Sequence, residues 1–258
     1  MKKLLALILL LPIAAFAASP FDGTWMTKID SVKMSDKPNV LLLDKGVFKC
    51  SNCVPPIEVK ADGADHAVTG HAYYDTVAVR VAGPNSVQVV RKQAGKPTLS
   101  SDYAISADGK SLTDKFTDQT GKETANAETT FTRVAAGPAG SHALSGSWRA
   151  DKLQNASANW ITVTYKSAPG GFAMSAPTGQ SYEAKFDGKE YLTAGDPGHT
   201  MVSLKSVDAH TVIETDKRLG KVTDVIRMTV SADGKSMQVV DEDKEAGMDA
   251  SWTMEKKH

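Results

Sequence analysis

Four residues of types that bind metals or carry redox chemistry lie within one segment of the chain. Cys50 and Cys53 are followed by His66 and His71 in the spacing Cys-x2-Cys-x12-His-x4-His, which is that of a zinc finger. A finger needs both histidines on one helix face, whereas the surrounding DHAVTGH contains β-branched residues and a glycine. On a regular strand these two histidines would point to opposite faces. We predict no metal and no cofactor here; a metal site made possible by a bulge at Gly70 is the alternative.

The Cys50–Cys53 pair also has the spacing of a redox motif. Redox Cys-x-x-Cys pairs need a helix N-terminus behind them to lower the pKa of one thiol. Pro55, Pro56 and the strand-like segment after them offer no such helix. Disulfides persist in exported proteins, and residues i and i+3 of a turn lie close enough to be bridged. A structural disulfide between Cys50 and Cys53 is therefore the prediction.

The first 17 residues have the organisation of a secretory signal peptide. Lys2 and Lys3 precede an apolar run over residues 4–16, and Ala15-Phe16-Ala17 is a small-x-small cleavage site. The apolar run is too short for a stable membrane-spanning helix. The sequence predicts a bacterial periplasmic or secreted protein whose mature chain does not insert into a membrane.

The charge balance and the missing motifs exclude several classes of function. Removal of residues 1–17 leaves 28 basic against 30 acidic residues, without basic clusters. Such a chain has no electrostatic reason to bind nucleic acid. The sequence contains no nucleophile elbow, phosphate-binding glycine loop or His-Glu-x-x-His motif. We therefore expect no catalytic residues and no enzymatic activity.

The elements that must position any site come from an internal repeat. Residues 57–112 align without gaps on 182–237, with 17 identities in 56 positions, including SADGKS in both copies. The predicted units are a first repeat over 19–134, a linker over 135–143 and a second repeat over 144–258.

Within each copy the apolar residues recur every second position. Val77, Val79 and Val81 share one face of a run, and Asp-Gly and Gly-Lys turns separate such runs. The prediction is an all-β protein of two tandem up-and-down antiparallel barrels with about eight strands each, because closure removes exposed sheet edges. One sheet shared by both copies remains an alternative.

FDGTW (21–25) and LSGSW (144–148) open the two copies. This Gly-x-Trp pattern resembles the first strand of the lipocalins and fatty-acid-binding proteins, the calycin barrels. The resemblance implies that Trp25 and Trp148 close barrel ends and that a basic residue of each last strand stacks on the indole. Arg133 is the residue expected to stack on Trp25, whereas the second copy has Met254 at the comparable place. The chain also resembles uncharacterised exported bacterial proteins with FKC-x-x-C and K-x-D-G-K segments, which implies no function.

GHAYYD (70–75) is the other local concentration of polar aromatic residues. His71, Tyr73 and Tyr74 could line a barrel mouth, where aromatic bodies and polar tips both suit a ligand. The leading expectation is a non-enzymatic exported protein that binds a small apolar ligand inside a barrel. The alternatives are an interaction module with filled barrels, and a metal- or redox-dependent envelope protein using residues 50–71.

Overall fold

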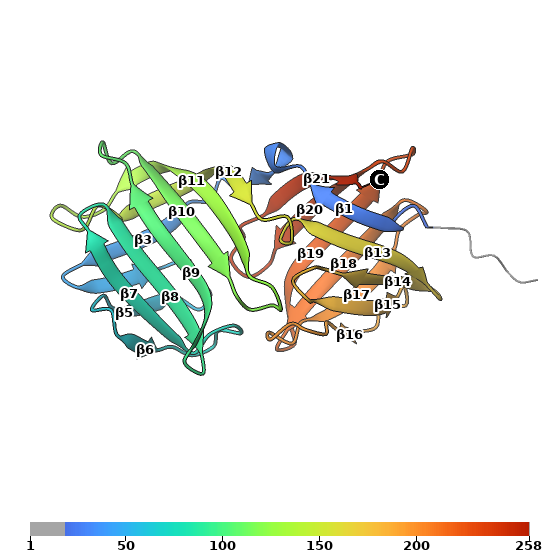
Figure 1. Ribbon diagram of the computed structural model, residues 1–258, viewed down its shortest axis with the longest axis horizontal. Helices are drawn as coiled ribbons and strands as arrows, with labels where there is room; N and C mark the ends of the chain where they lie inside the picture. Colours follow the sequence, from blue (N-terminus) through green and yellow to red (C-terminus); the bar gives the residue numbers. More distant parts are fainter. Residues whose placement is uncertain (1–18, 258) are drawn as a thin grey trace, which may run out of the picture.

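The computed structural model describes residues 19–257, and its strands form two antiparallel sheets, each rolled into a nearly closed barrel (Figure 1). The predicted all-β class and the two tandem barrels are confirmed, with ten strands in the main order of each sheet rather than about eight. The predicted signal peptide lies outside the described residues. Within residues 19–257, no helix is long and apolar enough to span a bilayer.

The first barrel follows the order β5-β4-β3-β12-β11-β10-β9-β8-β7-β6. Its strands are β3 (Asn39–Asp44), β4 (Val47–Cys50), β5 (Ile57–Lys60), β6 (Asp65–Ala67), β7 (Thr76–Gly83), β8 (Ser86–Gln93), β9 (Lys96–Ile105), β10 (Ser111–Asp118), β11 (Ala125–Ala136) and β12 (Gly146–Ala156).

The second barrel follows the order β15-β14-β13-β1-β21-β20-β19-β18-β17-β16, and β2 pairs with β21 beside it. Its strands are β1 (Gly23–Thr27), β2 (Lys33–Met34), β13 (Thr162–Ala168), β14 (Gly171–Ser175), β15 (Ser181–Lys185), β16 (Tyr191–Leu192), β17 (Met201–Ser206), β18 (Thr211–Arg218), β19 (Lys221–Val230), β20 (Ser236–Asp243) and β21 (Ala250–Lys256). The short 3-10 helix η1 (Ile29–Ser31) lies between β1 and β2.

The two copies exchange their first strands. β1 pairs with β13 and β21 of the second copy, and β12 pairs with β3 and β11 of the first. Figure 1 shows the blue β1 beside the red β21, and the yellow β12 beside the green β11. The expected contiguous units, 19–134 and 144–258, are therefore wrong as a description of the barrels. Since Gly-x-Trp opens both copies, either first strand fits either barrel chemically, and the motif could not reveal the exchange.

Period-two alternation gives each barrel its core. In β7 Val77 and Val79 are fully buried and Arg80 is exposed, whereas Val81, expected on the same face as the two valines, is exposed near the end of the strand. The same pattern in β17 buries Val202 and Leu204. Each sheet therefore turns one apolar face inward, and the two cores are separate clusters.

Each exchanged strand places its tryptophan in the core of the other copy's barrel. The indoles of Trp25 and Trp148 are fully buried, and each donates to the carbonyl oxygen of the residue four positions earlier. Arg133 lies 3.9 Å from the ring centroid of Trp148, and Lys256 lies 4.8 Å from that of Trp25. The expected stacking of Arg133 on Trp25 is therefore wrong, because Trp25 belongs to the other barrel. Lys256, two residues past Met254, has the equivalent role in the second barrel.

The glycine of the motif leaves room for this cation. Gly146 has a φ of +146°, and a Cβ there would lie 2.7 Å from the Arg133 guanidinium. Arg133 also donates to the carbonyl oxygens of Gly109, Ala143 and Ser145, so it fastens the end of the linker to the first barrel. The residue pattern Gly-x-Trp with a basic partner thus has a steric reason in both barrels.

Contacts between the barrels fix them against one another. The Lys122 amide donates to the Thr178 carbonyl oxygen at 2.6 Å. The Arg218 guanidinium of the second barrel lies 5.7 Å from the ring centroid of Tyr73 in the first and donates to its hydroxyl. The Tyr73 ring packs directly against Gly198. A Cβ at this position would lie only 2.8 Å from the ring, so a larger residue would clash with it. Tyr73 thereby comes to lie at the mouth of the second barrel.

Candidate ligand-binding site

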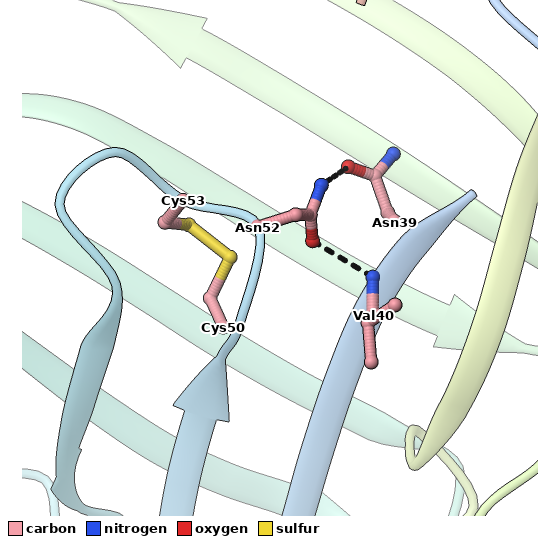
Figure 2. Close-up of a disulfide and its surroundings, with 5 residues drawn as sticks. All are labelled: Asn39, Val40, Cys50, Asn52 and Cys53. Carbon is pink, nitrogen blue, oxygen red and sulfur yellow. Dashed lines mark hydrogen bonds between the residues drawn. A yellow bond between two sulfur atoms is a disulfide. The ribbon is translucent and has the colours of Figure 1, made fainter. Parts of the chain in front are cut away.

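Cys50 and Cys53 form a disulfide, as predicted (Figure 2). The loop between them is held to the start of β3 by Asn52, whose side chain accepts from the Val40 amide and donates to the Asn39 side chain. The equivalent loop of the second copy, residues 176–180, is closed by backbone hydrogen bonds instead. The disulfide therefore stabilises a turn that the fold also builds without sulfur.

The two histidines of the zinc-finger spacing have other partners. His66 pairs with Asp62 at 2.8 Å, and the ring of His71 stacks on that of Tyr74 at 4.4 Å between centroids. In the part of the chain that the structure describes, no cluster of three or more His, Cys, Asp or Glu side chains is arranged to hold a metal ion.

His71, Tyr73 and Tyr74 lie at the junction of the barrels. All three line a groove of about 350 Å³ there, together with Arg218. Burial raises the pKa of both tyrosines and lowers that of His71. The GHAYYD pattern thus indicated residues at the edge of a cavity. Of His71, Tyr73 and Tyr74, however, only Tyr73 also lines the larger cleft that enters the second barrel.

This larger cleft, about 440 Å³, occupies the mouth of the second barrel. Its second-barrel walls combine apolar and polar side chains, among them Met174, Tyr182, Thr193, Val202, Glu214 and Asp216. Tyr73, Leu99 and Phe116 of the first barrel complete the wall. The first barrel therefore forms part of the entrance to the second.

A second cavity of about 210 Å³ reaches the same interior from another side. Its lining is mostly apolar and includes Trp160, Ile226, Met228 and Trp252. Met174 and Glu214 line both cavities. Glu214 therefore borders both hollows of the second barrel.

Glu214 is a carboxyl group in a largely apolar interior. It is 7% exposed, and Tyr182 donates its hydroxyl proton to Oε2. Burial raises the pKa of Glu214 to about 7. Hydrogen bonding to Tyr182 and to Asp216 acts in the opposite direction, and the negative charge of Asp241 adds to the effect of burial. Burial, with the neighbouring Glu214 charge, also raises the pKa of Tyr182 well above its ordinary value.

Asp216 lies two residues further along β18, on the same face as Glu214. Burial and the Glu214 charge raise the pKa of Asp216 to about 8, although Arg218 opposes this. Arg218 itself makes ion pairs with Asp224 at 3.7 Å and Glu245 at 3.2 Å. The cleft therefore has an acidic interior whose carboxyls hold protons near neutral pH.

Several buried polar atoms of this interior lack a hydrogen-bond partner within residues 19–257, among them Oγ1 of Thr162 and Oδ1 of Asp241. In the wall of the 440 Å³ cleft the unpartnered atoms are Oγ1 of Thr193 and Oδ1 of Asp216. Thr193 is 7% exposed and lines the 440 Å³ cleft. Buried polar groups are normally hydrogen-bonded, so both atoms retain unused capacity for a ligand.

A cavity of the first barrel, beside its disulfide, is smaller, at about 160 Å³. The side chains of Arg91 and Asp114, which have opposite charges, line this cavity. Burial raises the pKa of Asp114 to about 7. This cavity thus has its own cation.

The repeat itself marks the difference between the two interiors. β8 and β18 occupy equivalent registers, since Val87 pairs with Tyr103 as Val212 pairs with Met228. The same 125-residue offset places Glu214 on Val89, Asp216 on Arg91 and Thr193 on Val68.

Sequence reasoning overlooked the acidic residues of the second barrel, although the signal for them existed. Glu214 has the inward parity of its strand at a position where the other copy has valine. The replacement of an apolar core residue by a carboxyl group indicates a site.

No protein-family model, curated protein or solved structure matches this chain.

Proposed function

We propose that this chain is an exported, non-enzymatic binding protein whose second barrel holds one small ligand with a largely apolar body. The observation that carries the proposal is a pair of cavities in the second barrel, of about 440 and 210 Å³, that share Met174 and Glu214 in their lining. Periplasmic or secreted localisation follows from the signal-peptide pattern of residues 1–17.

The size and lining of the hollow support this function. Small-molecule sites are concave, mostly apolar and equipped with a few polar groups that orient the ligand. Met174, Val202 and Met228 offer the apolar contact, and Tyr182, Thr193 and Glu214 offer polar groups. Shape and burial of apolar surface would supply most of the affinity.

The resemblance to calycin barrels adds support of a weaker kind. Both barrels combine the Gly-x-Trp strand with a basic residue over the indole, Arg133 on Trp148 and Lys256 on Trp25. We propose a calycin-like relationship on this basis. Ten strands per barrel and the exchange of first strands depart from the eight-strand pattern that the resemblance implied.

The alternative of an interaction module with filled barrels suits the first barrel better than the second. The cavity beside its disulfide has a volume of about 160 Å³. In the proposed function the first barrel supports the entrance of the second through Tyr73, Leu99 and Phe116. One ligand per chain is therefore expected, whereas two would contradict this division of roles.

Calorimetric titration of the mature protein with octanol, a neutral molecule with an apolar chain, tests the proposal. Saturable binding of one octanol per chain is expected, and Met174→Trp should weaken it at least about tenfold by filling both cavities. Val207→Trp is the matched control, because Val207 is half exposed and lines neither cavity. Absence of binding, or equal binding to both variants, would refute the proposed chamber.

A further inference from the structure

The second barrel contains an excess of carboxyl groups that its fold does not need. The first barrel folds with Val89 and Arg91 at the positions that Glu214 and Asp216 occupy. Burying carboxyl groups destabilises a protein unless partners compensate for the lost hydration. Glu214 receives a hydrogen bond from Tyr182 and interacts with the neighbouring Asp216, but it forms no ion pair within the described chain, so its own barrel compensates only in part.

The charged and titratable groups around Glu214 are nearly all acidic or phenolic. Tyr182 (β15), Tyr165 (β13) and Asp241 (β20) act on it from other strands of the barrel, none of them paired with β18, and Asp216 lies beside it on β18. Asp224 (β19) faces Asp216 and Asp241 in turn. Arg218 is the one basic residue that lines the cleft within the described chain, and it makes ion pairs with Asp224 and Glu245. Within the described chain, Glu214 thus borders two cavities without forming an ion pair to a basic side chain.

Thr193 gives an independent indication of a ligand in the same place. Its hydroxyl is buried against the cleft without a hydrogen-bond partner in residues 19–257. The equivalent residue of the first copy is Val68, so the barrel does not require a hydroxyl at this position. A donor group of a ligand between Thr193 and Glu214 would satisfy the Thr193 oxygen.

We infer that the second barrel binds a small molecule with a protonated amine and an apolar body, the amine at Glu214 and Asp216 and the body against Met174 and Met228. This inference rests on the proposed ligand-binding function. An ammonium group supplies up to three donors, which matches the carboxylate oxygens and the Thr193 hydroxyl. Trp160 and Trp252, in the second cavity, offer apolar and aromatic contact to the body of the ligand.

Binding of the amine should compete with protons on the two carboxyls. Glu214 and Asp216 hold protons near neutral pH in the empty chamber, with pKa values of about 7 and about 8. A cation binds the ionised form, so the affinity for an amine should rise between pH 6 and pH 8.5. An alkyl amine remains charged throughout this range, because its pKa resembles that of lysine.

The test compares octylamine, octanol and octanoate in calorimetric titrations of the intact mature protein at pH 6 and pH 8.5. At pH 8.5 octylamine should bind at least about tenfold more tightly than octanol, and the ratio should shrink at pH 6. Octanoate should bind most weakly. Glu214→Gln should lower only the octylamine affinity, by about tenfold. Asp114→Asn, the matched change in the first barrel, should leave all three affinities unchanged.

The outcomes separate the two proposals. Octanol binding without a preference for octylamine on the unmodified protein would overturn the amine inference and leave the ligand chamber intact. An octylamine affinity that Glu214→Gln and Asp216→Asn both leave unchanged would overturn it as well. If none of the three molecules binds, the proposed function itself fails.

Discussion

Replacement of Glu214 by glutamine should make the empty protein more stable at mildly alkaline pH. Glutamine keeps the shape of the side chain and can still accept from the Tyr182 hydroxyl, but it carries no charge. At pH 5 Glu214 is already protonated in the folded chain, so variant and wild type should have similar free energies of unfolding.

The magnitude follows from the pKa of Glu214 in the two states. Burial raises it from 4.5 in the unfolded chain to about 7 in the folded protein. Between these values the folded state binds more protons than the unfolded state, so the free energy of unfolding falls as pH rises through this window. One pKa unit corresponds to about 1.4 kcal/mol, which gives a loss of about 3 kcal/mol by pH 8. Glu214→Gln should avoid this loss.

Urea unfolding at pH 5 and pH 8 measures the effect. Wild type should lose stability between the two values, and Glu214→Gln should lose about 3 kcal/mol less. Glu255→Gln is the control, since Glu255 forms an exposed ion pair with Lys28 and should leave the wild-type pH dependence intact. An unaltered pH dependence in Glu214→Gln would refute the reasoning that Glu214 is buried and protonated.

Three further predictions concern the framework of the barrels. Arg133→Ala should lower the free energy of unfolding of the first barrel by at least about 3 kcal/mol in urea titrations, because it removes donors to three carbonyl oxygens and the cation over Trp148; a loss below about 1 kcal/mol would contradict this role. Replacing Cys50 and Cys53 together by serine should lower it by about 2 kcal/mol at most and leave the circular dichroism spectrum unchanged, because the closed loop is short; loss of the folded state would contradict the view of a local staple. Cleavage within residues 135–143 should leave the two halves associated in size-exclusion chromatography, because each barrel contains a strand of the other half; separation into independent halves would contradict the exchange.

Much of the fold was predictable because it depends on local chemistry. Val77 and Val79 alternate with less buried residues as a barrel strand requires, and the Cys50–Cys53 spacing, the lack of a following helix and the export signal together indicated the disulfide. The strand exchange was not predictable, since residues around Trp25 and Trp148 are chemically alike. Which barrel each enters depends on the path of the whole chain, not on its local pattern.

The candidate site escaped sequence reasoning for a different reason. Cysteine, histidine and tyrosine are concentrated in one segment and indicated the groove near Tyr73. The acidic residues of the interior are single residues in ordinary strands, and no local motif marks them. The repeat contained the missing signal, because aligning β8 with β18 sets Glu214 against Val89 and Asp216 against Arg91. The size of the hollow depends on packing across many strands, which period-two alternation does not specify.

Chemical-shift mapping of octanol binding by methyl NMR tests the central claim that the second barrel is the ligand chamber. The methyl signals of Val202 and Met228, in the second barrel, should shift and saturate with octanol concentration. Those of Val77 and Val79, in the core of the first barrel, should stay in place. Saturable shifts confined to Val77 and Val79, or no shifts in either barrel, would contradict the account.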